Sequence, residues 1–107
     1  MPAASETLAF ETSPGRVALV GALTFAAVEA TGDDAGRVLS AQQQGRVDVD
    51  LQRVERADSA GLALLVGWIA AARAAQVTLA FHGMPERLRA IARICEVDAL
   101  LAEGGAA

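Results

Sequence analysis

The chain has 107 residues, of which 53% are hydrophobic, and a formal net charge of −4. This length suits one domain and no more, and the acidic balance argues against generic nucleic-acid binding, which needs a positive electrostatic field. The longest apolar stretch, residues 60–72, is too short to span a bilayer, which takes roughly 18–20 residues. We therefore expect a single domain over residues 1–107, with its core at about 5–102 and loose termini.

Residues 1–11 lack the basic and apolar regions of an export signal, which indicates a cytoplasmic protein. The single cysteine, Cys95, cannot form an internal disulfide and fits a reducing compartment. Because Cys95 falls on the apolar side of a predicted helix, we expect a buried and inert thiol.

The first predicted element is an antiparallel hairpin. Strands at residues 7–11 and 16–20 flank a turn that contains Pro14 and Gly15. Proline presets φ and glycine accepts a positive φ, which favours a tight connection. A helical stretch should follow from Thr24, with Phe25 facing the core, and the Gly-Asp-Asp run at 32–34 should interrupt it.

The polar residues 42–45 form a loop, and residues 46–51 then alternate as a half-buried strand. Val47, Val49 and Leu51 lie on its apolar face. Asp48 and Asp50 lie on its polar face. Residues 52–57 should form a short connection to a helix that begins near Ser59.

The helix from Ser59 should bury one continuous apolar stripe. The stripe has helical spacing and consists of Leu62, Leu65, Val66, Ile69 and Ala72. Trp68 lies off this stripe, and two placements are open for it. It lies beneath the neighbouring helix, or it is partly exposed as an interface anchor, a role in which tryptophan is enriched.

Residues 77–81 alternate as a further strand, and Pro85 suits the first turn of the next helix. The buried stripe of that helix should comprise Leu88, Ile91, Ala92 and Cys95. Residues 97–101 form a short apolar closing segment, and the chain from Gly104 should be loose.

The predicted order is strand, strand, helix, strand, helix, strand, helix. The later units are β-α-β crossovers, which are right-handed and make parallel neighbours. The clean alternation at 46–51 indicates a sheet that helices cover mainly on one face. The sequence thus predicts a small α/β domain with a mixed sheet of about four strands.

The junction Asp58-Ser59-Ala60-Gly61, where a strand gives way to an apolar helix, is the strongest candidate for a functional site. In one interpretation Asp58 or Ser59 is a helix N-cap, worth about 1 kcal/mol. In the other, Ser59 is a phosphate acceptor or a contact hydroxyl, since a phosphate would meet free backbone N–H groups and the positive end of the helix dipole. Ala60, Gly61 and Ala63 leave the helix start without bulk, so a partner backbone could approach closely.

The remaining polar residues give weaker signals. His82 is the only histidine, and metal sites usually need more ligands nearby. Asp48 and Asp50 fit a solvated strand face, and the chain has no phosphate-binding loop, CxxC pair or GxSxG motif. We predict no catalytic residue, metal or cofactor. An enzyme with a pocket near His82 and these carboxylates remains a third class, which a deep polar cavity would favour.

The strand at 47–51 and the segment RADSAGLALL at 56–65 resemble the central signature of STAS domains. These domains occur in anti-sigma-factor antagonists and in the cytoplasmic tails of sulfate transporters. The predicted order of elements fits that fold over nearly the whole chain. The resemblance implies a small STAS domain, with no enzymatic activity, that acts through protein–protein interaction.

Within this family, the segment ADSAGLALLVGW at 57–68 and GALTF at 21–25 are most similar to the STAS subunit of the Mla-type phospholipid ABC transporter. The similarity implies binding to the cytoplasmic ATPase subunit, support of transporter assembly and activity, and a role in outer-membrane lipid asymmetry. It also implies a location at the cytoplasmic face of the inner membrane, through the complex and without insertion.

The same similarity implies that the helix from Ser59 faces the partner. We expect Asp58 and Ser59 at the centre of the contact, with small residues allowing close approach and Trp68 as an anchor. The complete expected contact set is Asp58, Ser59, Ala60, Gly61, Ala63 and Trp68.

The alternative branch is the anti-sigma factor antagonist, in which the serine of a D-S-[SA]-G motif is phosphorylated by an anti-sigma kinase. Ser59 matches that serine. Antagonists commonly carry a G-E-L-D stretch after the second strand, whereas Gly21-Ala22-Leu23-Thr24 lacks both acids here. This departure argues against a kinase partner and leaves the transporter interpretation intact.

Overall fold

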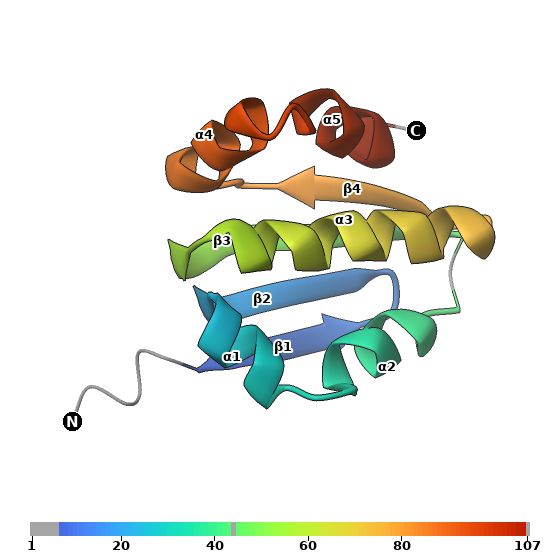
Figure 1. Cartoon of the computed structure of the whole chain (residues 1–107). Coiled ribbons are helices and arrows are strands. Elements are labelled where there is room, and N and C mark those ends of the chain that lie inside the picture. Colours follow the sequence, from blue (N-terminus) through green and yellow to red (C-terminus); the bar gives the residue numbers. More distant parts are fainter. Residues whose placement is uncertain (1–6, 44, 107) are drawn as a thin grey trace.

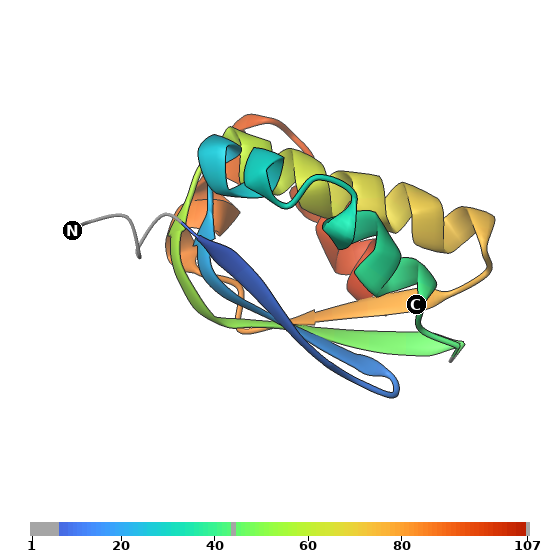
Figure 2. The same ribbon diagram turned by 90° about the horizontal axis from the view of Figure 1, so that it is seen from below.

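The computed structural model describes residues 7–43 and 45–106. They form a four-stranded sheet with the helices packed against one face, so the small α/β fold is confirmed (Figures 1 and 2). The elements are β1 Leu8–Ser13, β2 Arg16–Leu23, α1 Phe25–Ala30, α2 Asp34–Ser40, β3 Arg46–Ala57, α3 Ser59–Ala74, β4 Thr78–His82, α4 Glu86–Ile94 and α5 Asp98–Ala106. No helix in these ranges is long and apolar enough to cross a membrane.

The strands lie in the order β1-β2-β3-β4. β1 and β2 pair antiparallel, whereas β2–β3 and β3–β4 pair parallel, which gives the predicted mixed sheet. The hairpin turns at Pro14 and Gly15, where glycine has φ 75°. The polar loop holds this turn, because Gln42 accepts a 2.8 Å hydrogen bond from the Gly15 amide and donates one of 3.1 Å to the Ser13 carbonyl.

Strand β3 is longer than the sequence predicted, since residues 52–57 continue the strand instead of forming a connection. Two register shifts against β2 insert extra residues into β3. Its buried residues are therefore three apart, at Leu51, Val54 and Ala57, so the two-residue alternation stops where these bulges begin. The pairing of Leu23 with Ala57 brings the end of β3 beside the start of α1.

The predicted break after α1 is present, with Gly32 at φ 57° between two short helices. Phe25, however, is 61% exposed, and the prediction that it faces the core is wrong. Phe25 is the first residue of a six-residue helix whose buried contact comes from Ala27. The aromatic ring consequently stands at the rim of the helical layer.

Helix α3 lies across the middle of the sheet (Figure 1). Its buried stripe differs from the predicted one, because Val66 is only half-buried and Gly61 and Trp68 are buried. The buried residues are Gly61, Leu62, Leu65, Trp68, Ile69 and Ala72. Trp68 is 3% exposed and packs on Phe10 of β1, with ring centroids 6.1 Å apart. Of the two placements left open for Trp68, the buried one is correct, so its assignment as an exposed anchor is withdrawn. Strand β1, through Phe10, covers the side of α3 on which Trp68 lies.

The C-terminal part departs from the sequence prediction at two points. Cys95 is exposed, because α4 ends at Ile94 and the chain turns away at Glu96, which has φ 59°. The expected buried thiol is therefore wrong. Beyond it, the closing segment is helix α5, which continues to Ala106 and buries Leu101 against the core. The expected loose N-terminus, at residues 1–6, lies outside the described residues.

Candidate docking surface at the start of helix α3

Asp58 is the N-cap of α3. Its backbone is extended (φ −141°, ψ −172°), and its Oδ1 accepts hydrogen bonds from the amides of Ala60 at 2.9 Å and Gly61 at 3.2 Å. These amides belong to the first turn, which has no intrahelical acceptors of its own. The capping interpretation therefore holds for Asp58. The N–H groups of Ala60 and Gly61, which we expected to be free for a phosphate, already have an acceptor.

The same carboxylate also holds the neighbouring helix. Oδ2 of Asp58 accepts a 3.1 Å hydrogen bond from the amide of Phe25, the first residue of α1. In addition, the Asp58 amide donates to the Leu23 carbonyl at 3.2 Å. One side chain thus fixes the starts of α1 and α3 relative to each other. The sequence could not indicate this second role, because Phe25 and Asp58 are 33 residues apart.

Gly61 is buried where α3 crosses the end of β2. A β-carbon at this position would lie 2.7 Å from Cγ of Leu23 and would also collide with the Leu23 carbonyl oxygen. The lack of a side chain is required by this internal contact. Gly61 consequently allows the close approach of Leu23, and it is not open to a visiting partner as the sequence suggested.

The remaining predicted residues do reach the surface. Ser59 and Ala63 are exposed and Ala60 is half-buried. The Ser59 hydroxyl has no hydrogen-bond partner within residues 7–43 and 45–106, so it is available to solvent or to a ligand. Phe25 flanks the same capping residue from the α1 side. We call Phe25, Ser59, Ala60 and Ala63 the docking surface.

A basic side chain reaches the same end of the molecule from α4. Arg87 is exposed, and its Nε donates a 3.0 Å hydrogen bond to the carbonyl of Ala57, the last residue of β3. This bond uses only one of the donors of the guanidinium group, which has five. Arg87 therefore adds positive charge close to the docking surface. The sequence could not indicate this contact, because Arg87 and Ala57 are 30 residues apart.

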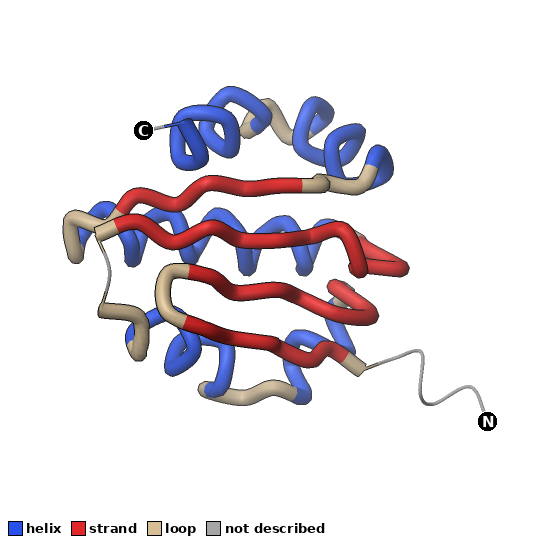
Figure 3. Tube along the Cα trace, turned by 180° about the vertical axis from the view of Figure 1, so that it is seen from behind, coloured by secondary structure: helices blue, strands red, loops and turns tan. Residues whose placement is uncertain are grey.

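Figure 3 shows the sheet face that no helix covers. Asp48 and Asp50 alternate along β3 with the core residues Val47, Val49 and Leu51, so their side chains lie on this face, and His82 contacts Asp48 there. His82 Nε2 and Asp48 Oδ1 are 2.9 Å apart across β4 and β3, and Arg46 lies 3.1 Å from the same oxygen. The hydrogen bond from His82, with the nearby Arg46 charge, lowers the pKa of Asp48 below its ordinary value. Both His82 and Asp48 are at least one-third exposed. The two side chains form a hydrogen-bonded pair at the surface.

Asp50 differs from the solvated residue that the sequence predicted, because it is buried. Arg16 lies 2.7 Å from Oδ2, and the amide of Gln52 donates to Oδ1 at 2.9 Å. The pair ties β2 to β3, and Glu11 and Arg53 form a similar bridge at 2.6 Å on the same face. The two predicted carboxylates thus take separate cationic partners, and among the described residues no cluster of three histidine, cysteine or acidic side chains could hold a metal.

Comparison with known proteins identifies the family. Residues 6–102 match the family model described as "Mlab, STAS domain". The chain is a STAS domain. A solved structure with the same fold is that of the anti-sigma factor antagonist SpoIIAA in its unphosphorylated form. It has a TM-score of 0.61 and 16% sequence identity, over 82% of this chain and 83% of that chain. No curated protein sequence matches this STAS domain.

Proposed function

We propose that this STAS domain is a non-enzymatic binding protein whose docking surface contacts the cytoplasmic ATPase subunit of an Mla-type phospholipid ABC transporter. In this role it supports the assembly and activity of a complex that maintains outer-membrane lipid asymmetry. The protein works at the cytoplasmic face of the inner membrane, held there by the complex. The observation that carries the proposal is the exposed Ser59 hydroxyl, which has no partner among the described residues, at a helix start where Asp58 caps α3 and also accepts from the amide of the exposed Phe25.

The exposed side chains of the docking surface suit protein contact. Aromatic residues often anchor interfaces, and Phe25 is 61% exposed. The other exposed large hydrophobic side chain among the described residues, Ile94, lies at the end of α4 and outside the docking surface. Because Asp58 already fixes α1 against α3, binding would order little further backbone. A standard interface buries about 800 Å² per partner, so the docking surface would form its centre and adjoining loops its rim.

Two overlapping sequence similarities support the transporter branch. The first is the similarity of residues 57–68 to the Mla-type subunit, and the second is the description of the matching family model, which carries the Mlab name.

The alternative function is that of an anti-sigma factor antagonist controlled by phosphorylation of Ser59. The exposure of the Ser59 hydroxyl favours it, since a kinase could reach this group. Against it, residues 21–24 lack the two acidic residues that antagonists commonly carry after the second strand. The description of the matching family model also carries the Mlab name. The transporter proposal is therefore preferred.

Purification of the tagged chain from its own host, with mass spectrometry of the bound proteins, separates the two functions. We expect an ABC-transporter ATPase together with its permease, and an unmodified Ser59. Recovery of a kinase and a sigma factor, with phosphate on Ser59, would instead establish the alternative. Incubation of the pure chain with ATP alone should leave Ser59 unmodified, because the chain carries no kinase motif.

A further inference from the structure

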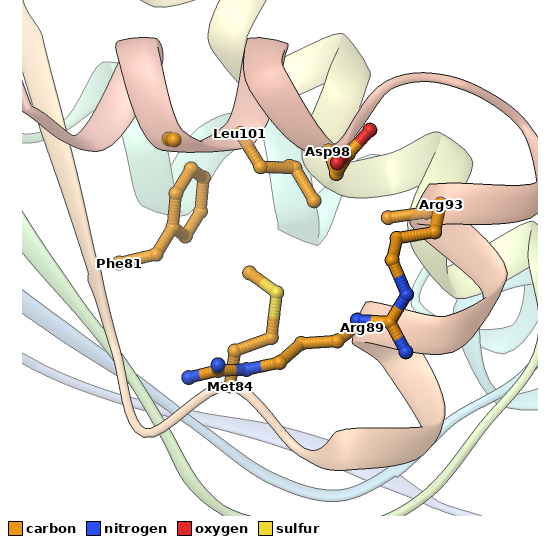
Figure 4. A pocket seen from close by; sticks show the side chains of 8 residues that line it. Phe81, Met84, Arg89, Arg93, Asp98 and Leu101 are labelled. Carbon is orange, nitrogen blue, oxygen red and sulfur yellow. The ribbon is translucent and has the colours of Figure 1, made fainter.

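A cavity lies between the C-terminal helices and the edge of the sheet, away from the start of α3. It has a volume of about 330 Å³. Its walls come from β4, from the loop that follows it, and from α4 and α5 (Figure 4). The docking role proposed above uses none of these lining residues.

The centre of the cavity is apolar. Phe81, Met84 and Leu101 surround it in Figure 4, and Ala92 completes the wall on the α4 side. Leu101 and Ala92 are buried, whereas Phe81 and Met84 are half-buried and are partly in contact with solvent. A ligand in this space would therefore cover apolar carbon that the fold leaves in contact with water.

Two arginines border this apolar centre. Arg89 and Arg93 lie one helical turn apart on α4, and both line the cavity. In Figure 4 Arg93 lies on the α4 side of the cavity, and the Arg89 side chain extends beneath Met84. The Arg89 guanidinium has no ion pair or hydrogen bond within residues 7–43 and 45–106. Arg93 has one contact, with Glu86 at 3.3 Å, and both of these side chains are more than half exposed. An exposed ion pair of this kind contributes little to folding stability, so a bound anion can replace Glu86 as the partner of Arg93.

One acidic side chain, Asp98, also lines the cavity, on the α5 side. Arg93 has Glu86 as its anionic partner, whereas Arg89 has none among the described residues. The Arg89 guanidinium therefore favours an anionic group in the cavity.

We propose that this cavity binds a small anionic amphiphile, a molecule with one carboxylate or phosphate head and an unbranched apolar chain. The head contacts Arg89 and Arg93, and the chain lies against Phe81, Met84 and Leu101. At ~30 Å³ per water-sized group, the volume of about 330 Å³ holds roughly eleven such groups. This is about the size of decanoate.

Nuclear magnetic resonance titration of the full chain with decanoate tests the proposal, with acetate and decanol as the head-only and chain-only probes. We expect saturable shifts at Phe81, Met84 and Leu101 with a dissociation constant on the order of 1 mM or below, given the modest affinity per atom of small ligands. Acetate and decanol should each bind at least about fivefold more weakly, since either lacks one of the two contacts.

Two variants and a control make the test specific. Arg89→Gln should weaken decanoate binding by about fivefold, as expected for the loss of one exposed cation. Arg37→Gln, at an exposed position on α2, should leave it unchanged. Ala102→Phe, at an exposed position that lines the cavity, should fill the space and abolish the shifts while the thermal transition is retained.

Equal effects of Arg89→Gln and Arg37→Gln would contradict the assigned head contact, and decanol binding as tightly as decanoate would contradict the anionic specificity. Vesicles of phosphatidylglycerol provide the last arm. Binding to these vesicles without any response to decanoate would overturn the proposal in favour of a membrane-surface contact.

Discussion

The start of α3 and the open face of the sheet both carry the polar residues that the sequence singled out, yet they use them differently. On the open face, side chains pair with side chains: Asp48 with His82, and Glu11 with Arg53. At the start of α3, the carboxylate of Asp58 pairs with backbone amides instead. These amides are thereby satisfied without Ser59, whose hydroxyl has no partner within residues 7–43 and 45–106. Because Asp58 bonds to backbone amides, the neighbouring Ser59 side chain can contact a partner protein. On the open face, each paired side chain already has another side chain as its partner.

The largest expected effect separates two glycines of the same helix. Gly61→Ala should destabilise the protein by about 1–3 kcal/mol, because the new methyl group collides with Leu23. Gly67→Ala meets no atom within 4 Å and should stabilise α3 by about 0.5–1 kcal/mol through helix propensity. Urea denaturation of both variants measures the difference. If the two substitutions shift the midpoint in the same direction, Gly61 does not have the packing role described here.

A second test concerns the double cap. Asp58→Ala should cost about 1–2 kcal/mol, since the first turn of α3 and the start of α1 both lose an acceptor. The matched control is Asp33→Ala, because Asp33 is the N-cap residue of α2 without any side-chain capping bond. Thermal unfolding of the two variants gives the comparison. Equal losses of stability in the two variants would show that the hydrogen bonds of the Asp58 side chain do not stabilise the protein.

A third test separates surface function from stability. Phe25→Ala should change the free energy of unfolding by no more than about 0.5 kcal/mol, as is usual for exposed side chains. The same change should weaken binding to the ATPase subunit by more than tenfold if Phe25 is an interface anchor. Chemical denaturation and calorimetric titration measure the two quantities. A large loss of stability would place Phe25 in the fold and not in the docking surface.

The smallest effect is expected on the open face of the sheet. The pKa of Asp48 is lowered in the folded state, chiefly by the His82 hydrogen bond, so the ionised carboxylate stabilises the fold above the pKa of the unfolded chain. This contribution disappears as the pH falls below about 4 and through the folded-state pKa. The melting temperature of the wild-type protein should therefore fall more steeply with acid than that of Asp48→Asn. Parallel curves would mean that the pair adds no stability.

The fold was predictable where local patterns carry it. The Pro14-Gly15 turn, the alternation at 46–51 and the capped helix after Asp58 each follow from neighbouring residues, and each is present. The strand beyond Leu51 was missed, since its bulges replace the alternation by a three-residue spacing. Cys95 was misplaced because the end of α4 depends on a positive-φ turn at Glu96.

The candidate site was predictable only in part. The exposure of Ser59 and the capping by Asp58 follow from their place at the strand–helix junction. The contact of Asp58 with Phe25 and the fit of Gly61 against Leu23 depend on how distant segments pack, so no local pattern indicates them. For the same reason Trp68 was offered two placements, and only the packing on Phe10 decided between them.

The most direct test of the docking surface is a calorimetric titration of the ATPase subunit with two serine-to-glutamate variants. Ser59→Glu places a charged, longer side chain at the centre of the docking surface, whereas Ser40→Glu makes the same change at the exposed end of α2. We predict at least tenfold weaker binding for Ser59→Glu and wild-type affinity for Ser40→Glu. Wild-type affinity in both variants would contradict a contact centred on the start of α3.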